Sequence, residues 1–326
     1  MLFIPQTIAL SLVDGADTTF KISTSESIEE LMASIKYIGL LSPPIVKKKS
    51  RTYTIISGFK RIAACLSLGW SSIEARVVDH KTSDLQCAKL AIADNLVNRP
   101  LNFIEQSISI SMLSNYYDDK AMIREANGLG LNMNASLLEK LKKTALLSPE
   151  LKKIILAGTI SLTIALELEK MDKPSVMALS QLFESLNPTF NIQKEILTMV
   201  KEISRNKDLP AGQLLNDRYF SSIIDNGEIS RSQKIQKIRY HLKKMRYPVI
   251  TQFEENFKHL MQRIDLPNEI KLSPPDNFEG TMYCIVFNFQ NLKEFEFGKE
   301  ALDKLMRHPE FIKIFEKEIA DHKSLH

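Results

Sequence analysis

The apolar periodicity of this chain changes near residue 100. Before that point, short apolar runs alternate with helical segments and glycine-containing turns, which is typical of a small mixed α/β domain. From Leu101 to about Met245 nearly every segment instead repeats apolar residues at helical spacing. The interruptions in that stretch are Pro149, Gly158, Pro174, Pro188 and Pro210. We therefore predict an α+β chain, with a small mixed α/β N-terminal domain followed by an all-helical middle domain.

Within the first 100 residues, Ser25 is the expected N-cap of a helix that stops at Gly39, and Gly69 is the expected stop of another. The remaining patterns indicate alternating strands and helices. The expected strands are 8–12, 45–48, 53–56 and 73–78, and the expected helices are 25–35, 60–68 and 83–96.

The pattern changes again after about residue 250. We expect a helix at 251–264, strands at 270–272 and 282–287, and a closing helix at 292–306. The second of these strands is apolar on both faces, so both faces need cover. A segment of roughly 75 residues with few strands struggles to supply it alone. A partner subunit, or packing on the helical domain, is the expected solution.

At 326 residues the chain is long enough for two or three domains of roughly 100–200 residues. We expect an N-terminal domain at 1–100, a helical domain at 101–230, a basic linker helix at 231–250 and a C-terminal module at 251–326. No run approaches the roughly 20 apolar residues of a membrane helix. Three widely separated cysteines fit a reducing cytoplasm rather than a disulfide framework. The N-terminus does not resemble a signal peptide.

The net charge of +4 is unevenly distributed. Residues 121–246 hold 20 basic and 13 acidic side chains, whereas residues 247–326 hold 10 and 14. A basic middle region suggests contact with a polyanion. A solvated helical surface with excess lysine is the open alternative.

One candidate site lies where a strand passes through Gly58 into a helix that begins near Lys60 and Arg61. Unpaired N–H groups at a helix start favour an anion, and the two cations add charge-assisted bonds to phosphate. The alternative is an ordinary strand–glycine–helix turn.

A second candidate segment, about 35 residues further on, offers Asp94, Asn95 and Arg99 beside a helix end. An acid next to an amide suits a hydrated Mg²⁺ held against phosphates, and Arg99 suits the phosphates themselves. Ordinary helix-capping chemistry is the alternative.

Four segments in the same order resemble the ParB/RepB/Spo-type partition protein family, over about residues 8–170. They are SIEELMASIKYIGLLSPPIV, SGFKRIAACLSLG followed by IEARVVD, DNLVNRPLNFIEQ, and LLSPELKKIILAGTISLTIALEL. The resemblance implies a ParB/sulfiredoxin-like N-terminal fold that binds CTP with Mg²⁺. It also implies a helix-turn-helix middle domain that binds double-stranded DNA, and a C-terminal dimerisation module. A ParA-like ATPase would be a further partner, and the expected location is the cytoplasm, on the nucleoid or a plasmid.

By this resemblance the nucleotide would contact Gly39, Gly58, Lys60, Arg61, Asn95 and Arg99, and the metal would contact Asp94 and Asn95. Two positions depart from the family pattern. Phe59 replaces the acid of its G-E-R-R motif, and Asp94 is shorter than the usual glutamate. We therefore expect nucleotide binding with slow or absent hydrolysis, so that enzymatic activity is open.

The same N-terminal fold occurs in sulfiredoxin and in free-amino-acid kinases. Sulfiredoxin needs a cysteine where this chain has Phe59, which disfavours that activity. A small-molecule phosphotransferase stays the alternative from another class. A transcriptional or nucleoid regulator on the same scaffold is a closer alternative.

For DNA contact, residues 126–130 resemble the turn of a helix-turn-helix and residues 134–147 its recognition helix. The candidate contacts are Asn134, Ser136, Lys140, Lys142 and Lys143, with lysines serving phosphates and asparagine suited to adenine. The run 231–246 holds seven basic residues and no acid, and is the second candidate for phosphate contact.

Overall fold

The structure is a computed structural model that describes residues 3–264, 266–267, 269–278, 280, 282–309 and 311–312. The chain divides into two compact units, Met1–Met171 and Asp172–His326, each described here by itself. This division is coarser than the four predicted domains, whose boundaries stay predictions. Within the described residues, no helix is long and apolar enough to cross a membrane.

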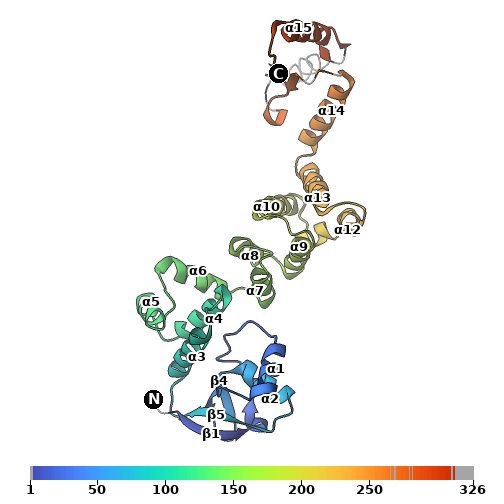
Figure 1. Cartoon of the computed structure of the whole chain (residues 1–326). Helices are drawn as coiled ribbons and strands as arrows, with labels where there is room; N and C mark the ends of the chain where they lie inside the picture. Colours follow the sequence, from blue (N-terminus) through green and yellow to red (C-terminus); the bar gives the residue numbers. More distant parts are fainter. Residues whose placement is uncertain are drawn as a thin grey trace. The chain divides into compact units, whose positions relative to one another are not determined.

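A sheet with β1, β4 and β5 lies in the N-terminal part of the first unit, drawn in blue (Figure 1). It has five strands, in the order β1-β5-β3-β4-β2. The β1–β5 and β3–β4 pairs are antiparallel, whereas β3–β5 and β2–β4 are parallel. The strands are β1 Ile4–Ala9, β2 Val13–Asp14, β3 Ile45–Lys48, β4 Tyr53–Ser57 and β5 Ser72–Val78. Every residue of β4 is buried, as expected for a strand inside a sheet with cover on both faces.

The described part of the first unit also contains eight α-helices. They are α1 Glu29–Ile38, α2 Phe59–Ser67, α3 Asp84–Asn98, α4 Phe103–Ser114, α5 Asp119–Gly128, α6 Ala135–Ala145, α7 Pro149–Leu156 and α8 Leu162–Leu168. Two apolar clusters hold the unit together. One lies around Val46, Ile55 and Cys65, and the other joins β-sheet residues to α3, α4, α5 and α6.

Side-chain caps explain where most of the later helices begin. Ser83 and Asn102 each form a reciprocal capping box, which fixes the starts of α3 and α4. Four further helices of this unit, α5 to α8, are capped by the residue just before their start, whose side chain accepts a backbone hydrogen bond. These caps are Asp118, Asn134, Ser148 and Ser161. The helical region was predicted from its apolar periodicity, whereas these caps fix where the individual helices begin.

Two predicted starts in the N-terminal region were wrong. The first strand was expected at 8–12, but β1 begins at Ile4, and Leu10–Leu12 form a short 3₁₀ turn that buries Leu10. The first helix begins at Glu29, not after Ser25, because the Ser25 hydroxyl accepts a hydrogen bond from Lys60 instead of capping a helix. The predicted stop at Gly39 is confirmed, with φ at +82°.

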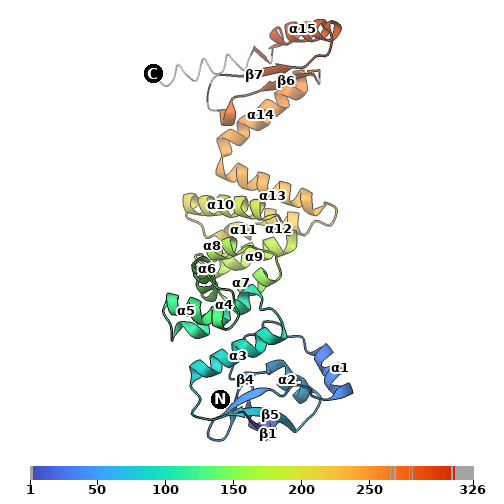
Figure 2. The same cartoon turned by 60° about the vertical axis from the view of Figure 1, so that its left-hand side comes forward.

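The second unit begins with helices. They are α9 Lys173–Leu186, α10 Phe190–Lys207, α11 Ala211–Leu215, α12 Arg218–Ile224, α13 Arg231–Arg246 and α14 Pro248–Ile264. Figure 2 shows α10 and α13 running side by side. Gly212 lets α11 approach α9 closely, since an added Cβ would lie 2.9 Å from the Pro174 carbonyl carbon.

The last described elements are β6 Ile270–Ser273, β7 Cys284–Phe287 and α15 Leu292–Met306, with β6 and β7 antiparallel. The helix–strand–strand–helix order therefore matches the sequence pattern. Its use as a dimerisation module stays a prediction.

Candidate anion-binding site

The turn between β4 and α2 is shaped by Gly58, which adopts a left-handed conformation with φ at +98°. A Cβ added there would lie 2.7 Å from the Pro44 Cβ, so the turn requires glycine. No side chain caps the start of α2. Its first N–H groups therefore lie at the turn without a side-chain acceptor, which suits an anion.

Asp94, near the end of α3, joins this turn to the second predicted segment. Its Oδ2 accepts a 2.5 Å hydrogen bond from the Ser57 hydroxyl and a 3.0 Å bond from the Arg61 guanidinium. Its Oδ1 faces the Arg76 guanidinium at 3.4 Å. The two segments that the sequence singled out thus meet at one largely buried carboxylate.

Arg61 extends this junction to the turn after α1. Its Nη1 donates to the Ser42 carbonyl at 2.9 Å, to the Ser42 hydroxyl at 2.8 Å and to the Pro43 carbonyl at 3.2 Å. Gly39 begins that turn. Three of the predicted segments are therefore adjacent, with Arg61 as the link between them.

Lys60 and Arg99 are directed to another place, the loop at 23–25. Lys60 Nζ donates to the Ser25 hydroxyl at 3.2 Å, and Arg99 Nη2 lies 3.5 Å from the Ser23 hydroxyl. Arg99 also forms a two-pronged ion pair with Glu105 at 2.6 and 2.7 Å. Lys60 and Arg99 thus meet at the loop 23–25, whereas Arg61 contacts Asp94 and the turn after α1, and each of the three cations is held by a protein acceptor.

The predicted metal ligands are arranged differently from a metal site. Asp94 already accepts three donors, two of them from arginines, and Asn95 donates its amide to the Ala91 carbonyl at 2.8 Å. In the part of the chain that the structure describes, no group of three or more His, Cys, Asp or Glu side chains could hold a metal ion. These residues therefore do not form a preassembled metal site.

Phe59 packs against the apolar cluster that contains Ile62 and Cys65. The turn accordingly carries an apolar side chain where the family motif has an acid. Burial raises the pKa of the Cys65 thiol, so this cysteine is a core residue rather than a reactive thiol.

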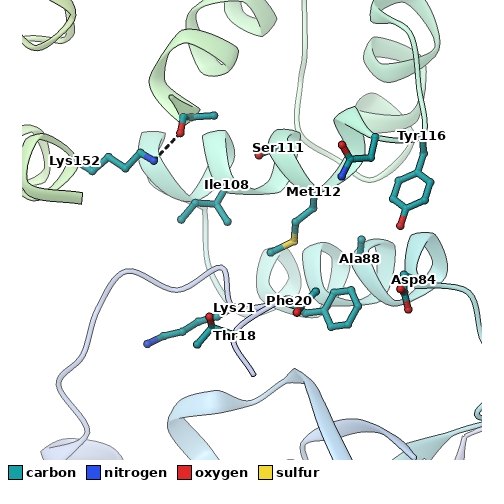
Figure 3. Close-up of a pocket in the computed structure, with 13 residues that line it drawn as sticks. Thr18, Phe20, Lys21, Asp84, Ala88, Ile108, Ser111, Met112, Tyr116 and Lys152 are labelled. Atoms are coloured by element: carbon teal, nitrogen blue, oxygen red, sulfur yellow. Dashed lines mark hydrogen bonds between the residues drawn. The ribbon is translucent and has the colours of Figure 1, made fainter. Parts of the chain in front are cut away.

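A cavity of about 370 Å³ lies at the other end of α3 (Figure 3). One side holds Lys152, whose ammonium donates to the Ala145 carbonyl at 2.8 Å, and burial lowers the pKa of this lysine. Its lining residues are Thr18, Thr19, Phe20, Lys21, Asp84, Ala88, Ile108, Ser111, Met112, Asn115, Tyr116, Ala145 and Lys152. The sequence offered no signal for it, because its walls come from several distant segments. None of the predicted site residues lines it.

The predicted DNA-contacting residues lie on or beside α6. Asn134 caps this helix by accepting from the Leu137 amide at 2.9 Å, and Asn127 pins the preceding turn through both backbone groups of Met133. Lys142 pairs with Asp119, whereas Asn134, Ser136, Lys140 and Lys143 are exposed. The turn was expected at 126–130, but α5 continues through Gly128, and Ala126 is a buried core residue of this helix.

The basic helix α13 has most of its charge paired within the second unit. Ion pairs join α13 to acids of α10 and α14, and Lys234 donates to the Ile224 carbonyl. The pairs are Arg239–Glu195, Lys243–Glu254, Lys244–Glu255 and Arg246–Glu202. The predicted phosphate contact by this helix therefore loses much of its support.

Residues 5–96 match the family model of the ParB N-terminal domain. This chain carries a ParB N-terminal domain. Its relatives include a nucleoid occlusion protein from Bacillus licheniformis, 28% identical over 192 residues, which are 58% of this chain and 65% of that protein. A probable chromosome-partitioning protein ParB from Campylobacter jejuni is 29% identical over 189 residues, 57% of this chain and 64% of that protein. The chain thus spans less than two thirds of the length of these relatives.

Among solved structures, a C-terminally truncated ParB from Caulobacter crescentus complexed with CTP-γ-S is 19% identical, with a TM-score of 0.26. The match covers 56% of this chain and 99% of that one. The same protein complexed to the centromeric parS site is 18% identical, with a TM-score of 0.32 and coverage of 55% and 91%.

Proposed function

We propose that this ParB-domain protein is a DNA-partition protein whose N-terminal domain binds CTP. The observation that carries the proposal is the junction at Asp94. There, Ser57 and Arg61 from the strand–glycine–helix turn contact the end of α3. Two motifs that lie far apart in the sequence are thereby joined into one place, next to an uncapped helix start. That arrangement is suited to a polyphosphate.

In this proposal the phosphates lie at Gly58, with Lys60 and Arg61 as cationic partners, and Arg99 and Asn95 approach from the end of α3. The turn that begins at Gly39 lies beside the base. Both arginines are well suited to phosphate, since their planar forks match its oxygens. Each must first give up the acceptor that it holds in this structure.

Mg²⁺ enters the proposal as an ion carried by the nucleotide's own phosphates, to which Mg²⁺ commonly binds while keeping several waters. Asp94 would contact it only after losing an arginine partner. Because Phe59 supplies no acid at the turn, we expect CTP to be bound and hydrolysed slowly at most.

The DNA-binding part of the proposal rests on α6. Its exposed face offers Asn134, Ser136, Lys140 and Lys143, with Lys142 partly engaged by Asp119. Lysines at such positions bind phosphates and an asparagine can read a base edge. Double-stranded DNA is the expected ligand, in the cytoplasm on a nucleoid or plasmid.

A homodimer through the C-terminal module completes the proposal, with a closed clamp around DNA as its working form. Apolar side chains of β7 and its neighbours stay exposed in the single chain, including Ile285, Val286 and Phe289. A second copy would cover them, which is the usual reason for such a surface. A ParA-like ATPase is a proposed partner with no assigned surface.

Nucleoid occlusion is the second candidate, because the relative from Bacillus licheniformis carries that name. Both candidates share a DNA site and a nucleotide. Sequencing the DNA fragments that the protein binds in cells would map its chromosomal or plasmid sites and distinguish the two candidates. Sites clustered beside one partition locus support partition, and sites dispersed over the chromosome support occlusion.

The test of the proposal is titration of labelled CTP into the full chain, with and without fragments selected from random DNA. We expect CTP binding, and a change in DNA binding when CTP is present. No CTP binding under either condition would refute the nucleotide proposal. Nucleotide turnover that needs a small hydroxylated substrate and no DNA would support the phosphotransferase alternative instead.

A further inference from the structure

Glu105 is the most completely buried charged side chain near the proposed nucleotide site. It lies in the first turn of α4 and is 0% exposed. Its Oε1 accepts from the Thr24 amide at 2.9 Å and the Thr24 hydroxyl at 3.2 Å, and its Oε2 from the Asn102 amide at 3.1 Å. Both oxygens also accept from Arg99. A buried carboxylate needs this number of donors to remain charged.

The two members of the Arg99–Glu105 pair differ sharply in their freedom to move. The Arg99 side chain is 43% exposed, whereas that of Glu105 is fully buried. Arg99 follows the last residue of α3 in an extended conformation, outside the helix. Its guanidinium is open to solvent on one side, while the carboxylate is fixed by α4 and by Thr24. Arg99 is therefore the partner that exchanges.

Moving Arg99 from Glu105 to a phosphate costs free energy, because it leaves the buried Glu105 carboxylate without its cation. Burial on its own raises the pKa of Glu105, but hydrogen bonds from Arg99, Thr24 and Asn102 outweigh it and leave the pKa below its usual value. If Arg99 turned to a phosphate, the carboxylate would keep three neutral donors and lose its only cation. Breaking a buried pair in this way opposes ligand binding.

We propose that Glu105 is the resident counter-ion of Arg99, and that a phosphate group must displace it to recruit Arg99. This inference rests on the proposed nucleotide site and deepens it. Glu105 is a positioning residue, because it holds Arg99 away from the ligand. It thereby lowers the apparent affinity of the site for polyphosphate.

The experiment is a titration of CTP and of inorganic tripolyphosphate into the full chain and into Glu105→Gln. Removing the competing charge should tighten both ligands by about tenfold, since Arg99 is then free to bind phosphate. Glu125→Gln is the matched control, because it removes a partly buried carboxylate that likewise pairs with a single cation, Lys89. It should change both affinities by less than about twofold.

The double variant Arg99→Gln/Glu105→Gln separates competition from a structural effect. The gain from Glu105→Gln should disappear in the Arg99→Gln background if Glu105 acts through Arg99. Equal gains in both backgrounds would overturn the proposal. Circular dichroism and thermal unfolding check each fold, and Glu105→Asp, which shortens the reach by one methylene, replaces Glu105→Gln if the latter unfolds.

The outcomes also distinguish this inference from the proposed function. CTP binding that Glu105→Gln leaves unchanged or weakens would overturn the counter-ion role alone. Tripolyphosphate binding that follows the expected pattern, with no preference for CTP, would support the counter-ion role and refute the cytidine nucleotide. Failure of every variant to bind either ligand would refute both.

Discussion

Helices α6 and α13 are both rich in lysine or arginine, but the structure uses their charges differently. On α6, Lys140 and Lys143 are exposed, and Lys143 pairs only with Glu139 of its own helix. On α13, four cations are paired with acids of α10 and α14. On α6, only Lys142 has its counter-charge on a neighbouring helix, at Asp119 of α5, within the part of the chain that the structure describes. A basic helix therefore offers more charge to a nucleic acid when neighbouring helices supply few of its counter-charges. We expect α6, and not α13, to contact DNA.

The largest effect is expected on α6. The double variant Lys140→Ala/Lys143→Ala should weaken DNA binding by roughly 10- to 100-fold at moderate salt, because two phosphate contacts are lost. The slope of log affinity against log salt should fall by about 2. Fluorescence anisotropy at several salt concentrations measures both. Lys170→Ala removes an exposed lysine paired with Glu167 and is the control. Unchanged DNA affinity in the double variant would remove α6 from the interface.

Removing the acidic partners of α13 tests the comparison in the opposite direction, by seeking a gain in DNA affinity. Glu254→Gln/Glu255→Gln would release Lys243 and Lys244 from their partners on α14. If internal pairing is what keeps α13 off DNA, non-specific DNA affinity should rise several-fold and the salt slope should steepen. Electrophoretic mobility shifts on unrelated DNA measure this. No rise would mean that α13 is kept from DNA by something other than its charge pairing.

The cap of α6 should matter for stability as well as for binding. Asn134→Ala removes the side-chain acceptor of the Leu137 amide and should cost about 1 kcal/mol of unfolding free energy. Asn134→Ser keeps a capping oxygen and should lose much less. Urea unfolding followed by circular dichroism compares the two. Equal losses would show that the cap is not what stabilises the start of α6.

A smaller effect separates α13 from α6 by stability alone. Arg246→Ala breaks a partly exposed ion pair with Glu202 and should lower the unfolding free energy by about 1 kcal/mol or less, with DNA affinity unchanged. The same measurements as for α6 apply. A large loss of DNA affinity here would contradict the contrast between the two helices.

The smallest effect is a pH response on α13. A hydrogen bond to Glu255, with some burial, raises the pKa of Tyr240 to about 12. A raised folded-state pKa contributes stability below the ordinary tyrosine value of about 10, and this contribution is lost as the pH rises toward 12. In Glu255→Gln the tyrosine should titrate near 10, as followed by NMR of labelled tyrosine. The same titration curve in both proteins would show that Glu255 does not bind Tyr240.

Local patterns predicted much of the first unit. The strand at 73–78 follows from alternation, the strand at 45–48 from its place before a polar turn, and the helix stop at Gly39 from a glycine suited to a left-handed conformation. Ser25 was assigned wrongly as a cap, because its real partner, Lys60, is distant in the sequence. Local rules describe hydrogen bonds within a few residues and miss those that folding creates.

The candidate site shows the same limit. Residue types and order pointed to Arg61, Asp94 and Arg99, but not to their partners in the fold. Glu105 lies within the segment DNLVNRPLNFIEQ, but its spacing from Arg99 in the sequence does not indicate a fully buried ion pair. The prediction that α13 contacts phosphates lost support for a related reason: the counter-ions of its basic residues lie on other helices.

Asp94 lies near the end of α3. Its carboxylate contacts Ser57 of β4, Arg61 of α2 and Arg76 of β5 at the same time. A single carboxylate therefore connects α3 with β4, α2 and β5. A ligand that drew Arg61 away would leave Asp94 with Ser57 and Arg76 as its partners. Binding at the turn would therefore change the contact between α2 and α3 directly, and through it the end of α3 that carries the second predicted segment.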